Sequence, residues 1–137
     1  MKKIIPLILC LFMVLGAFAQ TVFTEVSAEA GINHAFMVDL ATFGGGAAVL
    51  DFDKDGFEDV YITGGVSPDV LYHNNGDGTF TDVFEKAGLE HTLELYTQGV
   101  SAADVNKDGY KDLLITTMYV ADGTRSLAPN LLYLNQG

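Results

Sequence analysis

One acidic pattern of nine residues occurs twice in this chain of 137 residues. The copies are residues 51–59, DFDKDGFED, and residues 104–112, DVNKDGYKD. In both, oxygen-bearing side chains stand at positions 1, 3, 5 and 9, and a glycine that permits a sharp turn stands at position 6. Carboxylates this close repel one another unless a cation lies among them, and Ca²⁺ takes about six to eight oxygen ligands at about 2.3–2.6 Å. The pattern therefore predicts about two calcium ions, one in each loop.

The predicted ligands are the acidic or amide side chains of each loop together with one backbone carbonyl. In the first loop they are Asp51, Asp53, Asp55 and Asp59, with the carbonyl of Phe57. In the second loop they are Asp104, Asn106, Asp108 and Asp112, with the carbonyl of Tyr110. The alternative is a pair of solvated acidic turns that bind no metal. Two copies with the same spacing favour the metal-binding interpretation, because they are hard to explain without a shared ligand.

The residues around the loops argue against an EF-hand. An EF-hand loop carries a bidentate glutamate at position 12 and is flanked by helices, whereas position 12 here is Ile62 or Ile115. Short apolar runs precede and follow the loops at residues 47–50, 60–63, 100–103 and 113–116. The runs that follow the loops are rich in strand-forming residues. Each loop is therefore predicted to join the two strands of a β-hairpin.

The similarity between the two halves of the chain extends beyond the loops. The aligned pairs of segments are 46–63 with 99–116, 23–32 with 80–89, and 71–76 with 132–137. Units of this size that contain several short strands are typical of propeller-type arrays. We expect repeat one at about 22–79 and repeat two at about 80–137, within a repeat region of residues 20–137.

The segments 23–32 and 80–89 share the pattern Phe-Thr-x-Val followed by Ala-Gly and an aliphatic residue. Each is expected to begin as a strand and then to form a short helical turn, ended by a glycine C-cap at Gly31 or Gly88. Further strands are predicted at 69–73, 79–83 and 130–134.

Phe43-Gly44-Gly45-Gly46 followed by the first loop resembles an FG-GAP repeat, also called a VCBS-type repeat. The turn at residues 75–80 and the Phe-Thr-x-Val openings are similar to proteins of the ASPIC/UnbV and cartilage-acidic-protein type. The resemblance implies an all-β fold, a seven-bladed β-propeller of the integrin α type with calcium in its blade hairpins. This chain would form a partial β-propeller of about two FG-GAP-type blades plus the start of a third. It would then be the N-terminal fragment of a longer protein, whose remaining blades would pack on it.

The first 19 residues read as a signal peptide. Lys2 and Lys3 precede an apolar run at 4–17, and Ala17-Phe18-Ala19 fits the small-x-small rule for cleavage after Ala19. The alternative, a transmembrane anchor, would need about 20 apolar residues. We therefore expect a secreted, periplasmic or cell-surface protein with no transmembrane anchor after cleavage. Cys10, the one cysteine, would be removed with the signal peptide, which excludes a disulfide in the mature chain.

The formal net charge of −11 argues against nucleic acid as a partner. We expect an exported calcium-binding repeat module for protein or carbohydrate binding or adhesion. The alternative is the N-terminal part of a secreted propeller enzyme, such as a lyase, a hydrolase or a sugar-modifying protein, with its catalytic residues elsewhere. No catalytic set is visible. His34 and His91 occupy equivalent places in the repeats and are expected to make a hydrogen bond that fixes a loop; His73 is expected on the surface.

Overall fold

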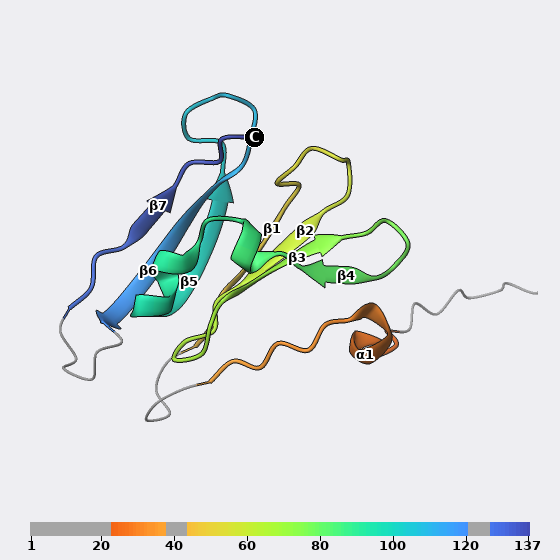
Figure 1. Cartoon of the computed structure of the whole chain (residues 1–137), viewed down its shortest axis with the longest axis horizontal. Coiled ribbons are helices and arrows are strands. Elements are labelled where there is room, and N and C mark those ends of the chain that lie inside the picture. The colour runs from red at the N-terminus through yellow and green to blue at the C-terminus, as the bar shows by residue number, and fades with distance from the viewer. Residues whose placement is uncertain (1–22, 38–43, 121–126) are drawn as a thin grey trace, which may run out of the picture.

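The computed structural model describes residues 23–37, 44–120 and 127–137. The predicted signal peptide and Phe43 lie outside these ranges. Two antiparallel sheets lie next to each other, with β1 of one sheet beside β5 of the other (Figure 1). No helix in the described ranges is long and apolar enough to cross a membrane. The predicted all-β architecture is confirmed at the level of these two sheets.

The first sheet has four strands in the order β1-β2-β3-β4. They are β1 (Ala47–Leu50), β2 (Asp59–Ile62), β3 (Val70–Asn74) and β4 (Phe80–Asp82). The second sheet has three strands in the order β5-β6-β7, which are β5 (Leu95–Ala103), β6 (Asp112–Val120) and β7 (Leu131–Tyr133). The helical elements are short and consist of α1 (Ser27–Ala30) and the 3₁₀ turns η1 (Phe84–Lys86) and η2 (Glu90–Glu94). Each acidic loop connects the two strands of a hairpin, β1–β2 in one sheet and β5–β6 in the other.

The two Phe-Thr-x-Val segments differ in structure, and one prediction for them is wrong. Residues 23–26 form no strand, and Phe23 is 96% exposed. The matching residues at 80–82 form β4, because their backbone pairs with β3 in the register Asn74↔Phe80. A strand needs such a partner for its N–H and C=O groups. The helical turns occur in both copies, and Gly31 and Gly88 follow them with φ of 78° and 71°.

The core lies between the two sheets. Side chains alternate between the faces of a strand, so one face of the first sheet meets one face of the second. The buried cluster consists of Leu50, Tyr61, Leu71, Phe84, Leu89, Leu113 and Ile115. Its members come from both sheets and from the segment that connects them. The two repeats therefore share one core.

The backbones of the two sheets come close together where Gly46 precedes β1 and Gly99 lies in β5. A Cβ added at Gly46 would stand 2.8 Å from the Gly99 Cα and 2.9 Å from the Val100 nitrogen. Both neighbours are backbone atoms, so the two strands would have to separate to make room.

We expect Gly46→Ala to lower the free energy of unfolding by about 1–3 kcal/mol, the usual cost of overpacking. Gly44→Ala is the matched control, since no atom of the described residues lies within 4 Å of a Cβ added there. Urea unfolding of both variants measures the effect. An equal, small change in both would contradict the close packing of the two strands.

A buried carboxylate, Asp69, also joins the sheets. It accepts hydrogen bonds from the Tyr61 hydroxyl (2.5 Å), the Gly64 N–H (2.7 Å) and the Thr97 hydroxyl (2.5 Å). Thr97 belongs to β5, and the other two donors belong to the first repeat. Burial, followed by the nearby charge of Asp69, raises the pKa of the Tyr61 phenol above its ordinary value.

This raised pKa makes stability sensitive to alkali. In the unfolded chain Tyr61 loses its proton near pH 10, whereas in the folded chain it keeps the proton. The stability is therefore intact below about pH 10 and falls as the pH rises above it. We expect unfolding free energies measured between about pH 8 and 11 to decrease, and the decrease to be smaller in Tyr61→Phe. An identical decrease in the variant would assign the effect to other groups.

Candidate metal centre

The two acidic loops have the same backbone conformation. At position 4, Lys54 and Lys107 have φ of 62° and 66°, and at position 6, Gly56 and Gly109 have φ of 91° and 90°. A lysine in the left-handed region is unfavourable and persists only where the surrounding contacts require it. The loop must therefore be fixed by contacts that both copies share.

These shared contacts are hydrogen bonds from the loop backbone to the acidic side chains. At position 1, Asp51 Oδ2 accepts from the Gly56 N–H at 3.1 Å, and Asp104 accepts from Gly109 at 3.0 Å. At position 5, the carboxylate accepts from the N–H two residues later at 2.8 Å in both loops. This bond is the main cause that lowers the pKa of Asp108. The acidic side chains therefore point toward the backbone of their own loop, which brings their charges close together.

The aspartates at position 9 are the buried members of the two sets. Asp59 is 0% exposed, and its oxygens accept from the N–H groups of Phe52 (3.0 Å) and Asn74 (2.8 Å). Asp112 is 1% exposed and accepts from Val105 (2.8 Å) and Asn135 (2.9 Å) in the same way. Asp59 therefore attaches its loop to the end of β3, and Asp112 attaches its loop to the residues that follow β7. The spacing alone had suggested a ligand and not this structural role.

The first loop brings several possible metal ligands close together, as the binding of a divalent cation requires. Oxygens of Asp51, Asp53 and Asp59 lie within 4.8 Å of one another. Asp51 Oδ1 is buried and has no hydrogen-bond partner among the described residues. A buried carboxylate oxygen without a partner is costly, so this atom fits a bound cation. The donor set is all oxygen, as calcium prefers.

The second loop has the same arrangement with one charge fewer. Asn106 replaces an aspartate at position 3, and its amide donates to Asp108 Oδ2 at 2.7 Å. The described residues of this loop contain no group of three acidic or histidine donors that are mutually close. Asn106 and the carbonyl of Tyr110 would have to complete such a site with Asp104, Asp108 and Asp112. The remaining predicted ligand, Phe57, occupies the equivalent place to Tyr110 in the first loop.

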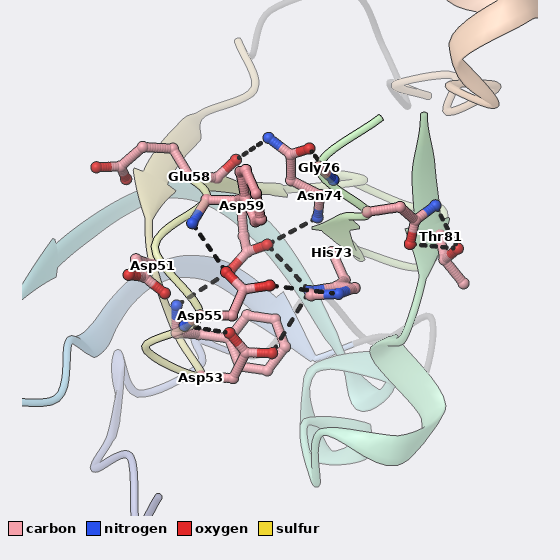
Figure 2. A network of polar contacts seen from close by, with 12 residues as sticks. Asp51, Asp53, Asp55, Glu58, Asp59, His73, Asn74, Gly76 and Thr81 are labelled. Atoms are coloured by element: carbon pink, nitrogen blue, oxygen red, sulfur yellow. Dashed lines mark hydrogen bonds and ion pairs between the residues drawn. The ribbon is translucent and has the colours of Figure 1, made fainter. Parts of the chain in front are cut away.

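The structure places His73, whose side chain is 25% exposed, against the first loop, a contact that the predicted surface position did not include. Its ring lies among the acidic side chains (Figure 2), and its Nδ1 is 3.3 Å from Asp59 Oδ1 and 3.5 Å from Asp53 Oδ2. Its Nε2 is 3.8 Å from Asp55 Oδ2. The strand register could have indicated this position, because the pairing of Val60 with Tyr72 puts His73 beside Asp59.

The other two histidines are not equivalent in the structure. His34 Nε2 lies 3.2 Å from the carbonyl oxygen of Thr63, which ties residues 32–37 to the first sheet as expected. His91 instead lies 3.3 Å from Glu94 within η2, and its side chain is exposed. Neither residue approaches an acidic loop closely enough to be identified as a ligand.

The two sheets, with one acidic loop in a hairpin of each, are of the FG-GAP type. Residues 51–115 match the FG-GAP-like repeat family, and the predicted resemblance is confirmed. The chain is also similar to cartilage acidic protein 1 of Homo sapiens, with 33% identity over 90 residues, which is 66% of this chain. It is 32% identical to cartilage acidic protein 1 of Xenopus tropicalis over 93 residues, or 68% of this chain. In both comparisons the chain spans 13% of the relative's length.

Proposed function

We propose that this chain is part of an exported calcium-binding repeat module that binds a protein or glycan partner. The observation that supports it best is the buried Asp51 Oδ1, which has no hydrogen-bond partner in the described part of the chain and lies in a loop whose φ angles are repeated in the second hairpin. FG-GAP-like repeats and an acidic composition agree with this proposal. Calcium bound in each loop would neutralise adjacent carboxylates and fix the β1–β2 and β5–β6 turns.

We further propose that the two sheets are blades of a β-propeller. Tyr61 and Leu71 of the first sheet are 0% and 2% exposed, because the second sheet covers them. The residues at equivalent repeat positions in the second sheet, Leu114 and Leu132, are 47% and 55% exposed. In a propeller, the next blade would cover this apolar face in the same manner.

Calcium should bind to two sites in the whole chain and raise its melting temperature. A metal that binds only the folded state adds about 2.7 kcal/mol at a hundredfold excess over Kd. We expect calorimetry to give about two sites with Kd of roughly 10⁻³ M or tighter, and a chelator to lower the melting temperature. Asp55→Ala and Asp108→Ala should each remove one site.

The control for these variants is Asp77→Ala. Asp77 is an acidic residue outside both loops, and among the described residues it accepts hydrogen bonds only from Thr79 within its own turn. It should leave both sites intact. Equal melting temperatures in calcium and in chelator would show that the loops are acidic turns and would refute the proposed function.

A further inference from the structure

We propose that the first loop is a mixed nitrogen and oxygen site, in which His73 binds a transition-metal ion such as Zn²⁺ together with Asp53 and Asp55. The first loop would then accept either calcium or a transition-metal ion, and the second loop only calcium. This inference rests on the proposed metal-binding function of the first loop and adds a difference in metal preference between the two repeats.

The first support is the position of the imidazole. His73 lies on β3, a separate strand from the loop, and its ring enters the acidic group (Figure 2). Its Nδ1 is buried and has no hydrogen-bond partner among the described residues, although Asp53 and Asp59 are 3.5 and 3.3 Å away. A buried ring nitrogen that faces carboxylates without a hydrogen bond is a free ligand atom.

The distances around His73 fit donors that share an ion better than donors that share a proton. Its three contacts with carboxylate oxygens measure 3.3, 3.5 and 3.8 Å. Hydrogen bonds between nitrogen and oxygen are usually about 2.7–3.2 Å long. Two ligands bound at about 2.0–2.1 Å to one tetrahedral zinc lie about 3.3–3.4 Å apart. Of the proposed ligands, Asp53 is close to that separation from Nδ1, whereas Asp55 lies 3.8 Å from Nε2 and would have to move toward an ion bound at Nδ1.

The first loop contains two overlapping donor groups. One is the oxygen-only group of Asp51, Asp53 and Asp59, and the other is Asp53, Asp55 and His73, in which the donor atoms also lie within 4.8 Å of one another. Calcium prefers the first group because its ligands are oxygens, whereas imidazole favours zinc and other transition metals. Since Asp53 belongs to both groups, we expect the two ions to compete.

The second repeat is an internal comparison. Leu134 stands at the place of His73, and its side chain cannot bind a metal. Asn106 stands at the place of Asp53, so the shared carboxylate is also missing. The second loop therefore has neither the imidazole nor the carboxylate that would favour a transition metal.

Titration of the full chain with Zn²⁺ and with Ca²⁺ at one fixed pH tests the inference. We expect His73→Leu to weaken zinc binding about tenfold or more, because loss of even an outer partner of a zinc ligand has such an effect. Calcium binding should change less than about threefold. The control is His91→Leu, which removes an exposed histidine away from both loops. NMR of the imidazole nitrogens should show that zinc shifts the Nδ1 signal of His73.

Each outcome has one meaning. Equal zinc affinity in the wild type and in His73→Leu would overturn the inference, even if calcium still bound to both loops. Tighter binding of both ions by His73→Leu would overturn it too, because His73 would then be a counter-ion that competes with metal. Calcium binding without any zinc binding would refute only this inference. Failure to bind either metal would refute the proposed function as well.

Discussion

Asp69→Ala is expected to lower the free energy of unfolding by about 3–5 kcal/mol. The carboxylate is 4% exposed and accepts three hydrogen bonds, from Tyr61, Gly64 and Thr97. Its removal leaves three donors in the buried region between the sheets without an acceptor, and each such group costs about 1–3 kcal/mol. Partial relaxation and entry of water reduce the sum to the range given.

The effect of Asp69→Ala should be measured by chemical denaturation in the presence of a chelator, so that metal binding does not contribute. Asp82→Ala is the matched control, because Asp82 is exposed and accepts one hydrogen bond, from the Phe84 N–H at 3.0 Å. It should cost about 1 kcal/mol or less. A similar loss in both variants would show that the Asp69 network does not hold the two repeats together.

The hairpins could be predicted from sequence because their signals are local. An apolar run, a loop with glycine at position 6 and a second apolar run define β1–β2 and β5–β6 without information from elsewhere in the chain. The second copy of each signal strengthened the prediction. The same local argument fails at residues 23–26, which have the residue types of a strand but pair with no strand in the part of the chain that the structure describes.

The parts that could not be predicted depend on contacts between distant residues. The sequence places Asp69 at the start of a predicted strand and gives it no special role, and only the packing of β5 against the first sheet brings Thr97 to it. His73 has no histidine counterpart in the second repeat, so the comparison of the repeats does not indicate a function for it. The difference at this position is instead what distinguishes the first loop from the second.

The two aspartates at position 9 show a further limit of pattern reasoning. The spacing of oxygen donors does not show which carboxylate would face an ion and which one accepts hydrogen bonds from the backbone. Asp59 and Asp112 are buried and use both oxygens on backbone N–H groups. Asp53 and Asp55 remain partly exposed, with side-chain exposures of 39% and 34%, and their charges are more accessible to a cation.

This difference predicts separate outcomes for Asp59→Ala and Asp55→Ala in the absence of metal. Asp59→Ala should lower the free energy of unfolding by about 2–4 kcal/mol, since the partly buried N–H groups of Phe52 and Asn74 lose a charged acceptor. Asp55→Ala should cost about 1 kcal/mol or less, because its one backbone hydrogen bond is exposed to solvent.

Denaturation in chelator, followed by the same measurement in calcium, separates the structural role of Asp59 from a ligand role. In chelator only Asp59→Ala should be strongly destabilised, whereas in calcium both variants should lose the stabilisation that the first ion gives. Asp112→Ala should behave like Asp59→Ala, because its oxygens accept from Val105 and Asn135 with the same geometry. If Asp59→Ala were as stable as the wild type in chelator, the aspartate at position 9 would serve only as a metal ligand. Another interaction would then have to attach the loop to β3.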